Sequence, residues 1–141
     1  MTRFLLDTSI VSAAMWKTPD AGVLEKLEEH GGECAISANV WHELRYGIAR
    51  LPRGKRREVL ETFLRDVVHP TLPILPYDER AAEWLAIERV RLEKSGKHTA
   101  VVDGQIAAVA ATNGIPVVTA NVADFAFFKG LSVHNWMSEA H

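Results

Sequence analysis

Residues 4–9 read Phe-Leu-Leu-Asp-Thr-Ser, a short apolar run that ends at an acid. An unbroken apolar run of this length is typical of a strand buried on both faces, as strands are in a parallel sheet. The Asp-Thr-Ser that follows supplies turn and capping groups, which predicts a helix over about residues 9–16. The stretch therefore predicts an α/β fold. It also places Asp7 at the carboxyl end of the first strand, where open α/β sheets collect their ligands.

Outward from that stretch, strand and helix patterns alternate along the chain. Short apolar runs predict further strands at Ala35-Ile36, Ile74-Leu75, residues 115–119 and Ser132-Val133. Caps, glycines and prolines delimit helices over residues 20–30, 38–51, 55–68, 78–94 and 100–113, with one more helical turn near Ala123. The helix over 55–68 should be amphipathic and end at Pro70. This alternation predicts one domain over residues 1–141, a three-layer α/β/α sandwich with a mainly parallel central sheet.

The composition agrees with one compact domain, since the 141 residues are 48% hydrophobic. A single cysteine, Cys34, excludes an internal disulfide and a cysteine-based zinc site, and we expect it to be a small core residue. The first apolar run is too short for a signal peptide or a membrane span, which favours a cytoplasmic location. The net charge of −2 argues mildly against a nucleic-acid binder, because such proteins usually carry excess Lys and Arg.

A carboxylate interrupts the apolar face of the helix expected over residues 38–51. The inward stripe contains Glu43 among Val40, Leu44, Gly47, Ile48 and Leu51. Acids are almost never buried without a partner. Arg45 and Arg50 follow Glu43 at spacings of two and seven, which do not face it on a helix. A functional site is therefore favoured over a structural ion pair.

Two further acids occupy comparable positions. Asp103 lies in the most apolar helix of the chain, and its structural alternative is a first-turn acid that favours the helix dipole. Thr119, Asn121 and Asp124 follow the strand expected over 115–119, and their alternative is an ordinary loop. Asp7 likewise has the alternative of being a helix cap and nothing more.

All four acids are nevertheless expected at one edge of the sheet. Carboxylates packed this closely cannot all stay ionised without a cation. Oxygen ligands suit hard divalent ions, so Mg²⁺ or Mn²⁺ is the expected cofactor. The histidines show no zinc-ligand spacing and are expected to be surface or packing residues: His30, His42, His69, His98, His134 and His141.

A basic run partly offsets the negative net charge. Residues 45–57 contain no acid and six basic side chains: Arg45, Arg50, Arg53, Lys55, Arg56 and Arg57. Such a run is most often a solvated face, and the alternative is that it holds an RNA backbone.

The motifs around the acids resemble those of the PIN-domain nucleases, over nearly the whole chain. They are Leu-Leu-Asp7-Thr-Ser, Glu43-Leu followed by Gly47-Ile48, Asp103-Gly-Gln-Ile-Ala-Ala, and Thr119-Ala-Asn121-Val-Ala-Asp124-Phe. In length and motif wording the chain looks most like the VapC-type toxins of toxin–antitoxin pairs, including the FitB-like branch.

The resemblance implies a metal-dependent endoribonuclease that acts on structured RNA such as tRNA. It further implies a homodimer that is neutralised by a cognate VapB-like antitoxin. A larger assembly of toxin and antitoxin chains is also compatible with the resemblance. Asp7, Glu43 and Asp103 match the core acids of the family and Asp124 matches the fourth. Supporting roles fall to Thr8, Thr119 and Asn121. Hydrolysis with a metal-activated water predicts a 5′-phosphate and a 3′-hydroxyl.

Rival functions fit the residues less well. A haloacid-dehalogenase-like phosphatase needs a second Asp two residues after Asp7, where this chain has Ser9. A receiver-type signalling domain needs adjacent acids near the N-terminus and a Lys after a late strand, and Thr119-Ala-Asn121 contains none. A non-catalytic RNA- or protein-binding module of the same fold remains the alternative, although crowded acids would not help a binder near phosphate.

Overall fold

The computed structural model describes residues 1–138, and its centre is a five-stranded sheet. The strands are β1 (Phe4–Leu6), β2 (Cys34–Ser37), β3 (Ile74–Leu75), β4 (Val117–Val118) and β5 (Val133–His134). Their order is β3-β2-β1-β4-β5, and every neighbouring pair is parallel. The prediction of a mainly parallel sheet is confirmed. The strand expected over 115–119 is shorter than predicted.

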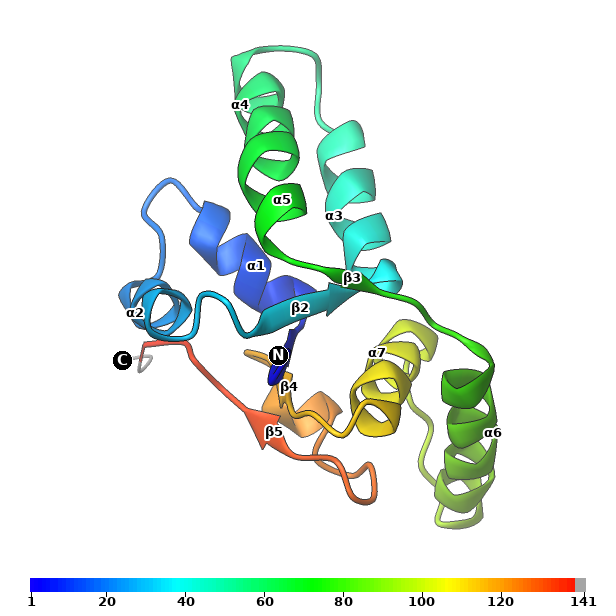
Figure 1. The fold of residues 1–141 in the computed structure, drawn as a ribbon. Coiled ribbons are helices and arrows are strands. Elements are labelled where there is room, and N and C mark those ends of the chain that lie inside the picture. Colours follow the sequence, from blue (N-terminus) through cyan, green and yellow to red (C-terminus); the bar gives the residue numbers. More distant parts are fainter. Residues whose placement is uncertain (139–141) are drawn as a thin grey trace.

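Helices connect the strands and cover both faces of the sheet. They are α1 (Thr8–Met15), α2 (Ala21–Glu29), α3 (Ala38–Ala49), α4 (Lys55–Phe63), α5 (His69–Thr71), α6 (Glu79–Lys94) and α7 (Val101–Thr112). A π-helical segment, η1 (Leu64–Val68), joins α4 to α5, and a 3₁₀ turn, η2 (Val122–Asp124), follows β4. In Figure 1 the α1–α2 pair and the α6–α7 pair lie on opposite sides of the sheet, which confirms the three-layer arrangement.

The strand order contains a switch point between β1 and β4. The chain steps outward from β1 to β2 and β3, then returns past β1 to form β4. β1 and β4 are therefore neighbours, with Leu5 opposite Val117 and Leu6 opposite Val118. Ligands of open α/β sheets bind at such a switch point, outside the carboxyl ends of the strands. Asp7 and Thr119 are the residues that follow these two strands.

The segment after α3 differs from the prediction of one amphipathic helix over residues 55–68. Helical structure continues through Pro70 to Thr71, with a π-helical turn in which the His69 N–H donates to the Leu64 carbonyl. Proline has no backbone N–H, and a widened turn is one way in which a helix tolerates the missing hydrogen bond. Val59 and Val67 are 53% and 45% exposed, so this helix buries a narrower stripe than its spacing suggested.

One apolar cluster fills the space between the sheet and its helices. β1, β2 and β4 are buried along their whole length, as expected for strands covered on both faces. Cys34 belongs to this core, as predicted. Within residues 1–138, no helix combines the length and apolarity that crossing a membrane requires.

Candidate active site

Asp7 is held by side chains and does not cap the helix that it precedes. It is 6% exposed, and its backbone N–H donates to the Val118 carbonyl across 2.9 Å. Although it occupies the N-cap position of α1, its carboxylate accepts no capping hydrogen bond. The Oδ2 atom instead accepts hydrogen bonds from Ser9 Oγ at 2.9 Å and from Thr119 Oγ1 at 2.8 Å. The interpretation of Asp7 as a helix cap alone is therefore wrong.

Backbone N–H groups orient the two hydroxyls. The Ala120 N–H donates to Ser9 Oγ, and the Asn121 N–H donates to Thr119 Oγ1, each at 3.0 Å. Because each hydroxyl accepts from the backbone, its own proton is free to point at the carboxylate. The hydroxyl of Thr119 therefore donates to the Asp7 carboxylate and can orient it. The sequence analysis did not assign Ser9 to the site, although Ser9 is the last residue of the Leu-Leu-Asp7-Thr-Ser motif.

Glu43 is partly buried on α3, and Thr8 Oγ1 donates to its Oε1 at 2.6 Å. Its surroundings differ from the predicted stripe, since Gly47 is exposed and Leu51 lies beyond the helix. The buried positions of α3 are Val40, Leu44 and Ile48, and Glu43 lies at their margin. Among residues 1–138 no ion pair joins Glu43 to a basic side chain, so its polar partner is the hydroxyl of Thr8.

The pKa of Asp103 is affected by the three other acids. Burial is the main cause that raises its pKa to about 6, and the negative charges of Asp7, Asp124 and Glu43 raise it further, in that order. A helix dipole acting on a first-turn acid would lower the pKa, so the dipole does not explain this residue. Asp124 lies exposed on η2, and its charge nevertheless reaches Asp103.

The donor chemistry of this cluster fits a hard divalent cation. Its groups are carboxylate and hydroxyl oxygens, which Mg²⁺ and Mn²⁺ prefer. Burial and, after it, the charges of three neighbouring carboxylates raise the pKa of Asp103, and a bound cation would offset both effects. The acids are not closed around one point, because among residues 1–138 no three His, Cys, Asp or Glu side chains form a metal-ligating group.

The basic run begins at Arg45, two residues after Glu43 on α3. It extends from α3 to the start of α4, and the loop between these helices forms the tip of a hairpin that projects from the sheet (Figure 1). Arg57 donates to the Leu51 carbonyl at 3.2 Å and pairs with Glu61 at 3.5 Å. The charge of Arg57 is therefore partly balanced by an acid that lies outside the run. A cavity of about 210 Å³ at the tip includes Arg53 and Arg57 together with Glu58 and Glu61.

A second, apolar cavity of about 350 Å³ opens between α1, α2 and the η1–α5 segment. Its lining is almost entirely apolar: Leu6, Val11, Ala14, Leu24, Leu27, Gly31, Phe63, Val67, Val68, Thr71 and Leu72. Leu24 and Val67 on its rim are 44% and 45% exposed. Exposed apolar patches of this kind mark interaction surfaces.

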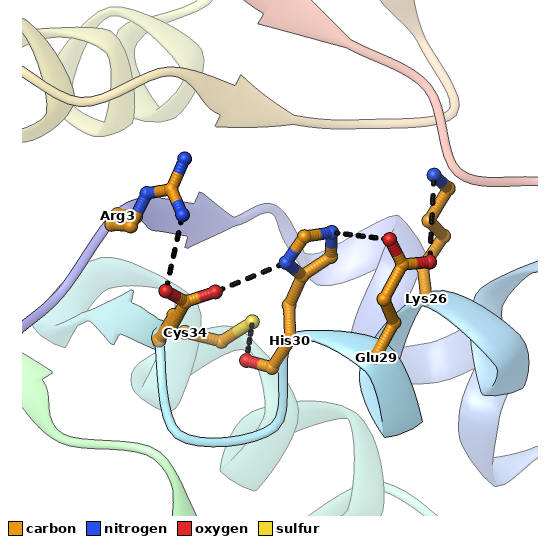
Figure 2. A network of polar contacts seen from close by, with 6 residues as sticks. Arg3, Lys26, Glu29, His30 and Cys34 are labelled. Carbon is orange, nitrogen blue, oxygen red and sulfur yellow. Dashed lines mark hydrogen bonds and ion pairs between the residues drawn. The ribbon is translucent and has the colours of Figure 1, made fainter.

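His30 joins a separate polar network that holds the end of α2 (Figure 2). Its Nδ1 lies 3.0 Å from Glu33 Oε1, and its Nε2 lies 3.5 Å from Glu29 Oε1. Arg3 completes the network by donating to Glu33 at 3.2 Å. The ring also stacks on Trp136. These contacts are those of a packing residue, as predicted for the histidines, while His141 lies outside the described residues.

Known proteins resemble the chain over nearly its whole length. The PIN domain model matches residues 4–126. A VapC ribonuclease of Sinorhizobium fredii is 36% identical and covers 86% of this chain and 89% of that protein. The toxin FitB of Neisseria gonorrhoeae is 34% identical over 93% of this chain and 96% of its own. The tRNA(fMet)-specific endonuclease VapC of Shigella flexneri is 30% identical over 96% and 99%.

Solved structures agree with these relatives. FitAB bound to a DNA fragment superposes with a TM-score of 0.85 at 32% identity, covering 98% of this chain and 99% of that one. DNA-bound VapBC from Salmonella typhimurium gives a TM-score of 0.86 at 26% identity, covering 96% and 99%. The match extends through β1, α3, α7 and β4, the elements that carry or adjoin the acids. The chain belongs to the PIN-domain family, among its VapC- and FitB-type ribonucleases.

Proposed function

We propose that the protein is a metal-dependent endoribonuclease and the toxin of a toxin–antitoxin pair. The observation that carries the proposal is the placement of the buried Asp7 and of Thr119, its hydrogen-bond donor, at the switch point between β1 and β4, with a pKa of Asp103 that burial and the charges of Asp7, Asp124 and Glu43 raise. The names of the relatives, which include ribonucleases and a toxin, support the reaction class.

The proposed roles follow from the contacts of each side chain. Asp7, Glu43, Asp103 and Asp124 would hold Mg²⁺ or Mn²⁺, which when bound supplies charge stabilisation at a scissile phosphate and lowers the pKa of water. Thr119 and Ser9 hold Asp7 by one oxygen, Oδ2, and neither donates to Oδ1. Thr8 holds Glu43 in the same way. The expected products carry a 5′-phosphate and a 3′-hydroxyl, since no 2′-hydroxyl nucleophile is needed.

The experiment is cleavage of end-labelled RNA by the purified protein with Mg²⁺ or Mn²⁺ and with excess EDTA. Asp7→Asn and Asp103→Asn should each abolish cleavage, while Asp66→Asn, which alters an exposed acid paired with Arg65, should leave it intact. Structured RNA such as tRNA is the first substrate to offer. A 2′,3′-cyclic phosphate product would contradict the mechanism. Tight RNA binding without cleavage of any RNA would favour a non-catalytic binding module.

The proposed partner is an antitoxin that docks in the apolar cavity between α1, α2 and the η1–α5 segment. An almost wholly apolar lining with exposed Leu24 and Val67 suits an apolar segment of a partner chain. The FitAB and VapBC assemblies among the similar structures support a partner of this class.

A homodimer is also proposed. α6 and the start of α7 expose apolar side chains, with Ile87 73%, Val90 52% and Val101 64% exposed. Light scattering coupled to size-exclusion chromatography tests the dimer, and Ile87→Glu should shift the protein toward a monomer.

A further inference from the structure

Two amides link the helices that carry Glu43 and Asp103. Asn39 Nδ2 on α3 donates to Gln105 Oε1 on α7 at 2.9 Å. Asn39 lies one helical turn before Glu43, on the same face of α3, and Gln105 lies two residues after Asp103. Among residues 1–138 this is the one side-chain hydrogen bond between α3 and α7.

The presence of an amide at position 39 is not explained by a gain in the free energy of unfolding. Its Oδ1 is buried without a hydrogen-bond donor. Turning both amides over would reverse the bond and leave a buried N–H of Asn39 without an acceptor, so neither orientation satisfies the side chain. An unpaired buried polar group costs about 1–3 kcal/mol, a cost that an apolar side chain of the same size would avoid.

Asp103 depends on its helix for its position. Asp7 is held by Ser9 and Thr119, and Glu43 is held by Thr8. Among the described residues no hydrogen bond reaches the Asp103 carboxylate. Its distance from Glu43 is therefore set by how α7 lies against α3. On its other side α7 packs closely on α6, since a Cβ at Gly104 would meet Leu85 Cδ1 at 2.9 Å.

We infer that Asn39 and Gln105 are positioning residues that hold α7 against α3 and so set the separation of Glu43 and Asp103. The inference rests on the proposed metal site, because its consequence is the affinity of that site for a divalent cation. Repulsion between the acids pushes the two helices apart, and the amide pair opposes it. Small displacements matter here, because Mg²⁺ requires near-ideal ligand geometry.

The test measures Mn²⁺ binding by electron paramagnetic resonance, without RNA, and thermal unfolding of the same samples. Asn39→Leu and Gln105→Leu should each weaken Mn²⁺ binding about fivefold or more. Asn39→Leu should keep or raise the Tm, because it removes the buried unpaired oxygen. The exchange variant Asn39→Gln/Gln105→Asn preserves the combined length of the two side chains, and it should recover most of the lost affinity.

A matched control breaks another hydrogen bond of α7. Arg80 donates to the Thr112 carbonyl at 2.8 Å, at the end of α7 far from Asp103. Arg80→Gln should lower the Tm slightly and leave Mn²⁺ affinity unchanged. Unchanged Mn²⁺ affinity in both leucine variants, or an equal loss in Arg80→Gln, would overturn the inference alone. Wild-type protein that binds Mn²⁺ no better than Asp103→Asn would overturn the metal site itself.

Discussion

Thr119 Oγ1 donates a hydrogen bond to Asp7 Oδ2 at 2.8 Å, joining residues that lie 112 positions apart in the chain. The bond spans the carboxyl ends of β1 and β4, which neighbour each other because the chain returns past β1 after completing β3. It gives the buried Asp7 carboxylate a donor at Oδ2, the oxygen that also accepts from Ser9 Oγ, and neither hydroxyl donates to Oδ1. One sheet register thus places both the acid and the group that orients it.

Thr119→Val tests this relationship, because valine keeps the shape of threonine and removes the hydroxyl. The free energy of unfolding should fall by about 1–3 kcal/mol, since Asp7 loses a donor and the Asn121 N–H loses its acceptor. RNA cleavage should fall about tenfold or more. Thr112→Val is the matched control, because that hydroxyl donates within α7 to the Ala108 carbonyl. Equal cleavage by both variants would contradict the role of Thr119.

Asp103→Asn should stabilise the protein in EDTA while abolishing its activity. The pKa of Asp103 is raised to about 6 in the folded state, so folding binds its proton more tightly than the unfolded chain does. Stability is therefore lost as the pH rises from about 4 to 6, and the loss persists at neutral pH. The gain from Asp103→Asn should be about 1 kcal/mol at pH 7.5, after allowance for partial exposure, and should vanish below pH 4.

Added Mg²⁺ provides the check on that prediction. The cation should raise the Tm of the wild type and leave Asp103→Asn nearly unchanged, since binding to the folded state alone stabilises it. A Tm for Asp103→Asn below that of the wild type in EDTA at neutral pH would show that repulsion is not the dominant effect.

Glu88→Gln tests a structural acid that the sequence reasoning missed. Glu88 is 6% exposed on α6, accepts two hydrogen bonds from Arg91 at 2.7 and 2.8 Å, and accepts one from the Lys129 N–H at 2.9 Å. The variant should lose about 2 kcal/mol at neutral pH. The hydrogen bonds from Arg91 lower the pKa of Glu88 below its ordinary value of 4.5.

The pH dependence of Glu88 follows from that direction. Its stabilising contribution should be present above about pH 4.5 and should be lost as the pH falls through the lower folded-state pKa. Thermal melts from pH 7 to pH 3 should therefore show the gap between wild type and Glu88→Gln closing in acid. Glu93→Gln, which alters an exposed pair with Arg89, should change stability by less than about 0.5 kcal/mol.

The basic hairpin tip is tested by Arg53→Gln/Arg56→Gln, two exposed side chains at the tip. If they contact the RNA backbone, binding should weaken and the slope of log affinity against log salt should decrease by about 1.4 for two lost contacts. Lys17→Gln/Arg65→Gln removes the same charge elsewhere and should leave the slope unchanged. An unchanged slope in both variants would identify the run as a solvated surface.

The apolar cavity is tested by Leu24→Asp and Val67→Asp. Each places a charge on its rim and should abolish co-purification with an antitoxin encoded by a small neighbouring open reading frame, because burying the charge is costly. RNA cleavage by the isolated protein should be unaffected. Val59→Asp is the control, since Val59 is at least as exposed as the two rim residues but lies outside the cavity lining. Retained binding by both rim variants would exclude this cavity as the docking site.

Much of the fold could be predicted because its signals are local. Short buried runs such as Phe4-Leu5-Leu6 mark strands. Capping residues mark the helix starts, and Asp20 and Asp78 accept capping hydrogen bonds from the Val23 and Ala81 N–H groups. The continuation of helical structure through Pro70 could not be predicted, because a π-turn depends on how the surrounding segment packs. The predicted buried stripe around Glu43 was wrong in including Gly47 and Leu51. Helical spacing identifies the face of a helix that is buried, but it does not give the width of that face.

The candidate site also combines features that local sequence shows with features that depend on the folded structure. The acids of the site could be recognised from the amino-acid pattern, because a carboxylate within an apolar pattern is anomalous wherever it lies in space. The folded chain was needed to see that the charges of Asp7, Asp124 and Glu43 act on Asp103. It was also needed to see that Ser9 and Thr119 donate hydrogen bonds to Asp7 and that Thr8 donates one to Glu43. Hydrogen bonds and Coulomb interactions depend on distances between segments, and the order of strands in the sheet sets those distances.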